Sequence, residues 1–400
     1  MNTSKPSVAA RILDIPPSAT VRIADMVANM RRQGIEIVDF SAGRASESSP
    51  DYINSTAAKA LMAGDTHQTM AQGRPEFREA CAKKLKQENG IDADPEKNIM
   101  ATLGCKNGLV LALMAILDLG DEVIIEDPCF VSYRAAIDIC GGTPVAVPIR
   151  HQNRFRWVKD DLESAVTENS RAILFSSPQN PTGTVHTPED LDIIRDLAAK
   201  YNLWVISDEI YERVTFAGHH HTCIATRPGM EGRSVTLMGF TKTFSMGGWR
   251  IGFVFAPEPV VKAMVISQQH LMTCAGSFTQ AGAAVALSEE YPSDVTEMWR
   301  DWEKRCLFSV SELQKLPNIS CDFPEGGFYA WIDISKTGEN SIVLAERLLS
   351  DYRVALVPGS AFGPTGEGYL RMTCVRSWNE LREGLSCLRQ AFARKEKKDV

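Results

Sequence analysis

The sequence predicts an α/β protein in which a large domain with a mostly parallel seven-stranded sheet is joined to a smaller α+β domain. Two patterns support this prediction. Between residues 99 and 255, short apolar runs alternate with helical patterns, which is typical of parallel strands covered by helices on both faces. After Pro257, long helical patterns come first, and short strands follow between further helices. A chain of 400 residues is also longer than one small core requires.

The large domain takes its expected sheet from seven apolar runs, short as strands buried on both faces should be. The expected strands are 99–103, 122–126, 144–148, 171–176, 203–207, 234–239 and 250–255. Helices are expected at 18–34, 50–62, 74–88, 109–119, 130–140, 161–166 and 188–201, with a further short strand at 35–40.

The smaller domain is expected to combine long helices with short strands. Its helices are predicted at 295–315, 342–352 and 378–394, after 260–272 and 277–287, and its strands at 320–323, 327–332, 354–357 and 369–372. We expect residues 1–45 to pack with the small domain, 46–285 to form the large domain and 286–400 the small one.

Composition excludes several function classes. The formal net charge is −7 and no stretch forms a basic stripe, so nucleic acid is not an expected partner. No run of about 18 apolar residues is present to span a bilayer, so a membrane is not expected either. Residues 1–10 lack the apolar core of a signal peptide, and a cytoplasmic location is therefore the default.

Cysteine and histidine patterns give no sign of a metal site. None of the ten cysteines forms a C-x-x-C pair, and most stand in apolar context as small buried residues. Three consecutive histidines occupy positions 219–221 after a glycine. Adjacent side chains point in different directions, so we interpret this segment as a solvated loop and expect no metal.

Polar residues stand at the ends of several expected strands, where ligands bind in open α/β sheets. Asn180 follows the strand 171–176, and Asp208 follows the strand 203–207, with Tyr211 three residues further on. A carboxylate at the end of an apolar strand needs a cationic partner, which a protonated ring nitrogen or an arginine would supply.

A glycine-rich segment after the strand 234–239 carries Lys242 and then Arg250. A lysine can form a Schiff base with an aldehyde, and an arginine can bind a phosphate. The turn at 104–108 ends one strand and begins a helix, whose unpaired amides also suit a phosphate. Each feature alone has an ordinary structural explanation, but together they indicate a ligand site.

With these residues in place, the chain resembles the class I/II aminotransferases, which are fold-type I enzymes that use pyridoxal 5′-phosphate (PLP). The resemblance covers nearly the whole chain and looks closest to the aspartate and aromatic aminotransferase branch. Its motifs are N-P-T-G at 180–183, S-D-E-I-Y at 207–211, T-K-T-F at 241–244 and G-W-R-I-G at 248–252.

The resemblance implies catalytic roles for Lys242, Asp208 and Tyr211. Lys242 would form the internal aldimine and, once displaced by the substrate, would carry the proton between Cα and C4′. Asp208 would keep the pyridine nitrogen protonated, which makes the ring an electron sink. Asn180 and Tyr211 would hydrogen-bond the ring O3′.

The resemblance also implies residues that bind the rest of the cofactor. Arg250 and the backbone amides of Cys105 and Lys106 would hold the phosphate. Phe130 would lie against the face of the ring.

Four residues are expected to bind the substrate. Arg371 would bind the α-carboxylate bidentately, with Asn180 beside it, and Gly43 would lie where the N-terminal segment closes over the substrate. Arg44 has two interpretations, either a solvated loop charge or a contact to an anionic substrate tail. The family is typically a homodimer with sites at the subunit interface, so residues 273–277 are candidates to serve the partner's site.

Three departures from the family pattern surround this site. Residues 44–47 read Arg-Ala-Ser-Glu in place of the usual tetrapeptide after Gly43. Gln68, beside His67, stands where a tyrosine commonly reaches the partner's phosphate. Gly239 replaces a serine, which removes one hydroxyl from the phosphate site.

The leading functional prediction is transfer of an amino group from an L-amino acid to a 2-oxo acid. One alternative is another PLP reaction that begins from the same Cα carbanion, such as elimination, replacement, cyclisation or amino-acid oxidation. A second is a PLP-binding regulator without catalysis, although no helix-turn-helix module precedes the domain.

Overall fold

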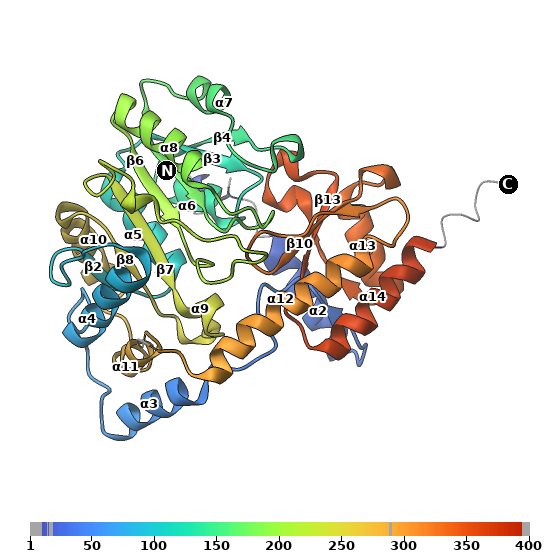
Figure 1. The fold of residues 1–400 in the computed structure, drawn as a ribbon, viewed down its shortest axis with the longest axis horizontal. Coiled ribbons are helices and arrows are strands. Elements are labelled where there is room, and N and C mark those ends of the chain that lie inside the picture. The colour runs from blue at the N-terminus through green and yellow to red at the C-terminus, as the bar shows by residue number, and fades with distance from the viewer. Residues whose placement is uncertain (1–9, 14, 16–18, 288–289, 394–400) are drawn as a thin grey trace, which may run out of the picture.

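The computed structural model describes residues 10–13, 15, 19–287 and 290–393. A large part built on one β-sheet lies beside a smaller part built on another (Figure 1). The large one is built on a seven-stranded sheet of order β2-β8-β7-β6-β5-β3-β4. Its strands are β2 (Ile99–Thr102), β3 (Glu122–Asp127), β4 (Thr143–Pro148), β5 (Ser170–Ser176), β6 (Trp204–Asp208), β7 (Ser234–Gly239) and β8 (Gly252–Phe255).

The predicted mostly parallel sheet is confirmed. Five consecutive strands, β4, β3, β5, β6 and β7, pair in parallel, and β8 is antiparallel to both of its neighbours, β7 and β2. Side chains alternate between the two faces, so that Val123 and Ile125 pack into one buried cluster and Ile124 into another. The parallel strands therefore bring their carboxyl ends to one edge.

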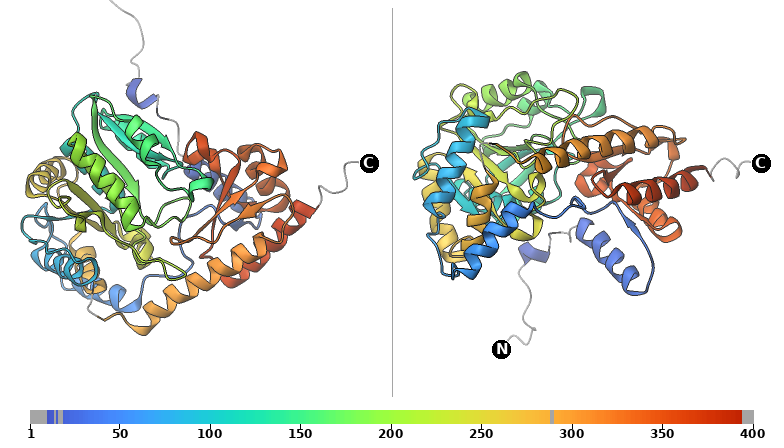
Figure 2. Two further views of the ribbon diagram at one scale, coloured as in Figure 1. Left: turned by 45° about the horizontal axis from the view of Figure 1, so that its top comes forward. Right: turned by 60° about the horizontal axis from the view of Figure 1, so that its bottom comes forward.

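Helices cover both faces of this sheet (Figures 1 and 2). Those of the N-terminal part and the large sheet are α1 (Ala10–Leu13), α2 (Ala19–Arg32), α3 (Asp51–Met62), α4 (Pro75–Lys84), α5 (Cys105–Ile116), α6 (Ser132–Ile139), α7 (Lys159–Ser164), α8 (Pro188–Tyr201), α9 (Phe240–Thr243), α10 (Glu258–Leu271) and α11 (Ser277–Ala286). The helix expected at 188–201 matches α8, whose first turn is closed by a capping box between Thr187 and Asp190.

Other predicted bounds need correction. The helix expected at 109–119 begins earlier, at Cys105, because Gly104 makes the turn after β2 with a φ of 86°. The strand expected at 35–40 shrinks to β1 (Val38–Asp39), and the helix expected at 74–88 ends in a π turn over Leu85–Asn89. Ser18, the expected helix cap, lies outside the described residues.

The smaller part contains an antiparallel sheet of order β12-β13-β10-β9. Its strands are β9 (Ser320–Cys321), β10 (Tyr329–Asp333), β12 (Val357–Pro358) and β13 (Tyr369–Thr373). Its helices are α12 (Ser293–Leu313), α13 (Ser341–Tyr352) and α14 (Trp378–Ala393). The single strand predicted at 354–357 is in fact two, because β11 (Val354–Ala355) leaves this sheet to pair with β1.

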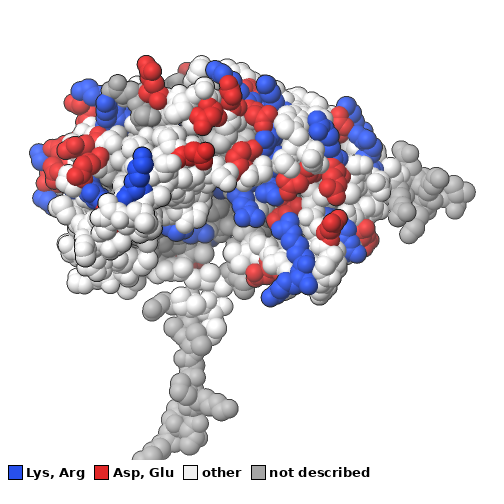
Figure 3. All heavy atoms as spheres, turned by 90° about the horizontal axis from the view of Figure 1, so that it is seen from below, with Lys and Arg blue, Asp and Glu red and all other residues white. Residues whose placement is uncertain are grey.

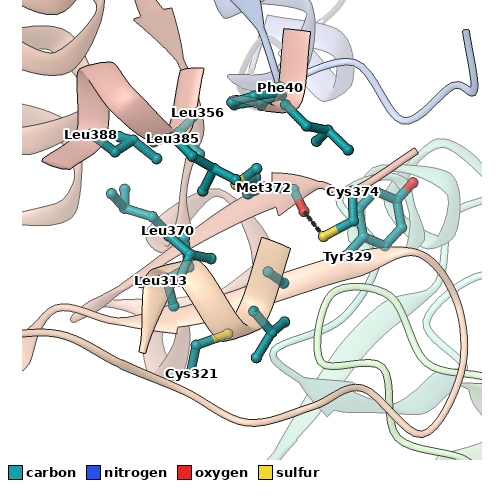
Figure 4. Packing of buried hydrophobic residues seen from close by; sticks show 14 of the residues in the cluster. Phe40, Leu313, Cys321, Tyr329, Leu356, Leu370, Met372, Cys374, Leu385 and Leu388 are labelled. Carbon is teal, nitrogen blue, oxygen red and sulfur yellow. Dashed lines mark hydrogen bonds between the residues drawn. The ribbon is translucent and has the colours of Figure 1, made fainter. Parts of the chain in front are cut away.

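The N-terminal segment thus joins the small domain through a β1–β11 pair. Phe40 continues this contact into the buried core shared by Leu313, Leu370 and Met372 (Figure 4). The exact domain limits stay a prediction.

The surface carries charges of both signs. On the face shown in Figure 3, Lys and Arg alternate with Asp and Glu and form no basic stripe. Within the part of the chain that the structure describes, no helix is both long and apolar enough to cross a bilayer.

Candidate active site

A cavity of about 510 Å³ opens at the carboxyl edge of the large sheet and extends to the small domain. It brings together residues from distant parts of the chain, including every residue predicted to bind the cofactor. These lining residues are Cys105, Lys106, Phe130, Asn180, Asp208, Tyr211, Lys242 and Arg250, together with Gly43 and Arg371 from the predicted substrate site. A second cleft, of about 360 Å³, lies between the domains beside Trp331 and Tyr369, but it holds none of the predicted residues.

Asp208 ends β6 and is buried at the floor of the cavity. Its Oδ2 accepts a hydrogen bond from the Tyr133 hydroxyl at 2.9 Å, and its Oδ1 accepts one from the Ile210 amide at 3.3 Å. Burial raises the pKa of Asp208 to about 6 despite these bonds. A carboxylate in this state would gain from a cationic partner.

Lys242 lies on the short helix α9, directly after β7. Its Nζ donates a hydrogen bond to the carbonyl oxygen of Gly43. The Tyr211 and Phe328 rings flank the amine, with centroids 5.8 and 5.6 Å from Nζ. The lysine therefore stands over the cavity between the two domains.

Arg371 lies in the middle of β13 and is almost fully buried. Its guanidinium donates to Asn180 Oδ1 at 3.1 Å and to the Ser41 carbonyl oxygen at 2.9 Å, and it covers the Tyr329 ring at 4.3 Å. Its Nε finds no partner among the described residues although it is buried. A buried guanidinium held on one side, with a free donor, suits a carboxylate.

The opposite end of the cavity is formed by the first turn of α5 and by Arg250. The Arg250 guanidinium donates to the Gly247 and Leu103 carbonyl oxygens at 3.1 and 3.0 Å. Lys106 extends over the Phe130 ring at 5.6 Å. Burial, together with Arg250 and Lys242, lowers the pKa of Lys106, which indicates an excess of positive charge here.

Gly239 has a steric explanation in this structure. A Cβ at this position would lie 2.7 Å from the Sγ of Cys105, closer than such atoms approach. Cys105 is buried, and burial raises the pKa of its thiol well above the ordinary value. The thiol therefore occupies the space that a residue with a side chain at 239 would need.

Arg44 is the one predicted site residue that does not line the cavity. It is exposed and borders a neighbouring hollow with Thr241, Arg376 and Glu380. His67 and Gln68 are also exposed, on the segment that joins α3 to α4. Their roles stay open.

The interpretation of 219–221 as a solvated loop is wrong for His221. Its side chain is 6% exposed, and its Nε2 lies 2.8 Å from Glu209 Oε2. Glu212 is close enough to both groups that the three could hold a metal ion. Glu212 already pairs with the buried Lys84, however, so the cluster contains its own cation. The contact brings a loop back over β6, which local sequence cannot reveal.

Two tyrosines in the cavity wall escaped the sequence analysis. Tyr133 lies on α6 and binds Asp208, and Tyr329 on β10 makes a 2.8 Å hydrogen bond with Tyr211. Tyr133 shares the buried face of its helix with Ala136 and Ile137, and Tyr329 begins an apolar strand, so both look like core residues. The only available signal was that a buried phenol requires a hydrogen-bond partner.

Comparison with known proteins gives a consistent assignment. The family "Aminotransferase class I and II" matches residues 35–388. The aspartate aminotransferase of Pyrococcus abyssi is 38% identical over 95% of this chain and 97% of its own. The aromatic-amino-acid aminotransferase 2 of Thermococcus litoralis is 39% identical over 98% of this chain and 100% of its own. The solved aspartate aminotransferase of Thermus thermophilus with maleate superimposes with a TM-score of 0.89 at 31% identity, covering 96% of this chain and 100% of that one.

Proposed function

The chain belongs to the aminotransferase class I and II family and is a PLP-dependent transferase, and we propose that Lys242, Asp208 and Arg371 carry its reaction. The observation that supports this most is the charge pattern of the cavity. Among its described lining residues, Asp208 is the only carboxylate, facing the cations Lys106, Lys242, Arg250 and Arg371. Such a cavity suits anionic ligands with one cationic ring atom.

The residues present fit PLP at each end of this cavity. The raised pKa of Asp208 shows a buried carboxylate that a protonated pyridine nitrogen would stabilise. At the other end, the first turn of α5 and the Arg250 guanidinium suit a phosphate. Ser176 adds a buried hydroxyl to the lining of this cavity.

PLP, when bound, supplies an aldehyde and an electron-accepting ring. In this proposal Lys242 would hold the cofactor through its aldehyde and, as a free amine, would move the proton of the substrate Cα. Arg371 would orient the substrate by its carboxylate, with Asn180 fixing the guanidinium. Asp208 would keep the ring nitrogen protonated, and Tyr133 fixes the direction of that carboxylate.

We also infer a homodimer. The segment around Gln68 and the segment after α10 lie side by side, because the Thr69 amide donates to Cys274 Sγ at 3.4 Å and Ser277 Oγ donates to the Asp65 carbonyl oxygen at 2.6 Å. Large apolar side chains stay exposed on and beside these segments, namely Met62, Met70, Ile266, Leu271 and Met272. A second copy covering this surface would bury them.

The cytoplasmic location remains a prediction. It is supported by ten cysteines that all carry free thiols, as expected in a reducing compartment.

The test uses purified enzyme loaded with PLP and mixed with one amino acid at a time, without any oxo acid. Transamination converts the bound cofactor to pyridoxamine 5′-phosphate and releases one 2-oxo acid for each site, which absorbance and product analysis follow. Lys242→Ala serves as the inactive control. Product formation with PLP regenerated, and no pyridoxamine form, would favour elimination or replacement and overturn the proposal.

A further inference from the structure

The Tyr329 hydroxyl occupies a narrow position between the domains. Tyr329 begins β10 and lies at the edge of the small-domain core, beside Cys374 (Figure 4). Its hydroxyl lies 2.8 Å from the Tyr211 hydroxyl. A Cβ on residue 43 would overlap this hydroxyl, so Gly43 is required for the tyrosine to reach the cavity.

The same position adjoins the free amine of Lys242. The Lys242 Nζ donates to the Gly43 carbonyl oxygen and lies 3.4 Å from the point that a Cβ on Gly43 would occupy. The Tyr329 hydroxyl and the lysine amine therefore meet at one glycine.

The charges around Tyr329 favour loss of its proton. The Arg371 guanidinium covers its ring at 4.3 Å, and the Lys242 amine faces its hydroxyl. Burial alone would raise the pKa of Tyr329, but these two cations and the hydrogen bond with Tyr211 outweigh burial and lower it. The pKa of Tyr211 is raised instead, by burial and by Tyr329. Tyr329 is thus the more acidic member of the pair.

We propose that Tyr329 is a positioning residue for Lys242: its hydroxyl and the Gly43 carbonyl oxygen together hold the released amine beside the substrate. A cation that stabilises a phenolate is attracted by that phenolate in return, so the charges described above strengthen this contact. This role rests on the proposed function, since only a lysine that leaves the cofactor needs a partner to hold its amine.

A first test needs no catalysis. In the apoprotein, ultraviolet difference absorbance detects phenolate as the pH is raised. Among the eight tyrosines, one should ionise before the others, and Tyr329→Phe should remove that step. Lys242→Ala should move the step to higher pH while leaving Tyr329 in place, because it removes a cation that stabilises the phenolate. If the early tyrosine ionisation is unchanged in either variant, the proposal is overturned.

A second test separates a role through Lys242 from a role through Tyr211. Tyr329→Phe should lower kcat about 10-fold to 100-fold with little change in KM, because a lysine amine that is no longer held is misplaced toward the substrate Cα. In Lys242→Ala rescued by methylamine, an amine that is not attached to the chain, adding Tyr329→Phe should change the rescued rate less than about 2-fold. Equal losses in both backgrounds, or no loss with Lys242 present, would contradict the proposal.

The outcomes distinguish this inference from the proposed function. If wild-type enzyme fails to form pyridoxamine 5′-phosphate with any amino acid, the proposed function fails, and the phenolate titration still decides whether Tyr329 and Lys242 are coupled. If the wild type transaminates and Tyr329→Phe matches it, only the inference fails. Cofactor uptake and the thermal midpoint of each variant are measured alongside to exclude misfolding.

Discussion

Asp208 and Glu209 are adjacent in sequence and both buried, yet their surroundings differ. Strand alternation turns Asp208 toward the cavity, where it forms no ion pair with any described residue and accepts bonds only from Tyr133 and an amide. Glu209 faces the protein interior, where Ser207 and His221 occupy its two oxygens at 2.9 and 2.8 Å.

The region behind Glu209 is a closed electrostatic network. We call it the Lys84 cluster, formed by Lys84, Glu88, Glu212, Arg213 and His221. Each acid there has a cation or a donor within the chain. The cavity, by contrast, leaves its charges for a ligand. A group whose charge the protein leaves uncompensated is the better guide to function than burial alone.

The largest effect should come from Lys242→Ala. Under the proposed function the cavity would then lack the residue that forms the Schiff base and carries the proton, so kcat should fall by at least about 10⁴-fold. Borohydride treatment followed by peptide mass spectrometry should no longer find the cofactor attached to the chain. Lys262→Ala, on an exposed ion pair with Glu258, should keep wild-type activity. Attachment retained in Lys242→Ala would refute the assignment.

Asp208→Asn and Glu209→Gln should change the free energy of unfolding in opposite directions. Asp208→Asn should lower kcat about 100-fold or more, yet stabilise the apoprotein at pH 7 by about 1–3 kcal/mol, because the chain no longer has to ionise a buried acid. Glu209→Gln should keep most activity and destabilise by about 1–3 kcal/mol, because it weakens the buried hydrogen bonds of Glu209 with Ser207 and His221.

The sign of the Asp208 effect follows from its pKa, which burial raises to about 6 in the folded chain. An acid whose folded-state pKa is raised destabilises the fold above that pH, and the penalty fades as pH falls from about 6 to 4. Urea unfolding of the apoproteins at pH 7 and pH 4.5 measures this. Equal free energies of unfolding for wild type and Asp208→Asn at both pH values would show that ionised Asp208 does not destabilise the apoprotein.

Glu212→Ala should destabilise the chain by about 1.5–3 kcal/mol without changing the chemistry, because it removes the nearest carboxylate from the buried Lys84 ammonium and leaves Glu88, 3.7 Å away, as its remaining anionic partner. Burial alone would raise the pKa of Glu212, but Lys84 and Arg213 outweigh it and lower it to about 2. The stabilisation is therefore full above about pH 4.3 and is lost as pH falls through about 2.

Urea midpoints at pH 7 and pH 3 check the Glu212 prediction, with the difference from wild type shrinking at the lower pH. Lys86→Ala, in an exposed pair with Asp92, is the control and should change stability by less than about 0.5 kcal/mol. A Glu212→Ala variant as stable as this control would show that the Lys84 cluster is not a closed network.

The smallest effect is expected from Gly239→Ser, which restores the hydroxyl common in the family. The new Cβ meets Cys105 Sγ, so we expect a loss of about 1–3 kcal/mol in stability. Adding Cys105→Ala should recover most of it by making room. If Gly239→Ser alone is neutral and binds PLP more tightly, the steric explanation is wrong.

The residues that we propose carry the chemistry could be predicted because each departs from the pattern of its surroundings. Asp208 and Asn180 put polar groups at the end of buried strands, and Lys242 stands on a turn between two apolar runs. Tyr133 and Tyr329 stand at positions typical of core residues in a helix and a strand. Only their hydrogen bonds to Asp208 and Tyr211 in the folded structure indicate that they belong to the site.

Contacts between distant segments explain the remaining misses. His221 reaches Glu209 only after the loop folds back, and Cys105 meets Gly239 only because the starts of α5 and α9 converge. The separation of β11 from β12 likewise depends on β1, which lies more than 300 residues away in the chain.

The long helix α12 runs from the large domain into the small one (Figure 2). Its Val295 packs in the large-domain core, and its Trp302 and Val310 pack in the small-domain core. Between them, Trp299 donates its indole N–H to the carbonyl oxygen of Thr243 at 2.7 Å, one residue after Lys242. The helix therefore ties the position of the small domain to that of the peptide that follows Lys242.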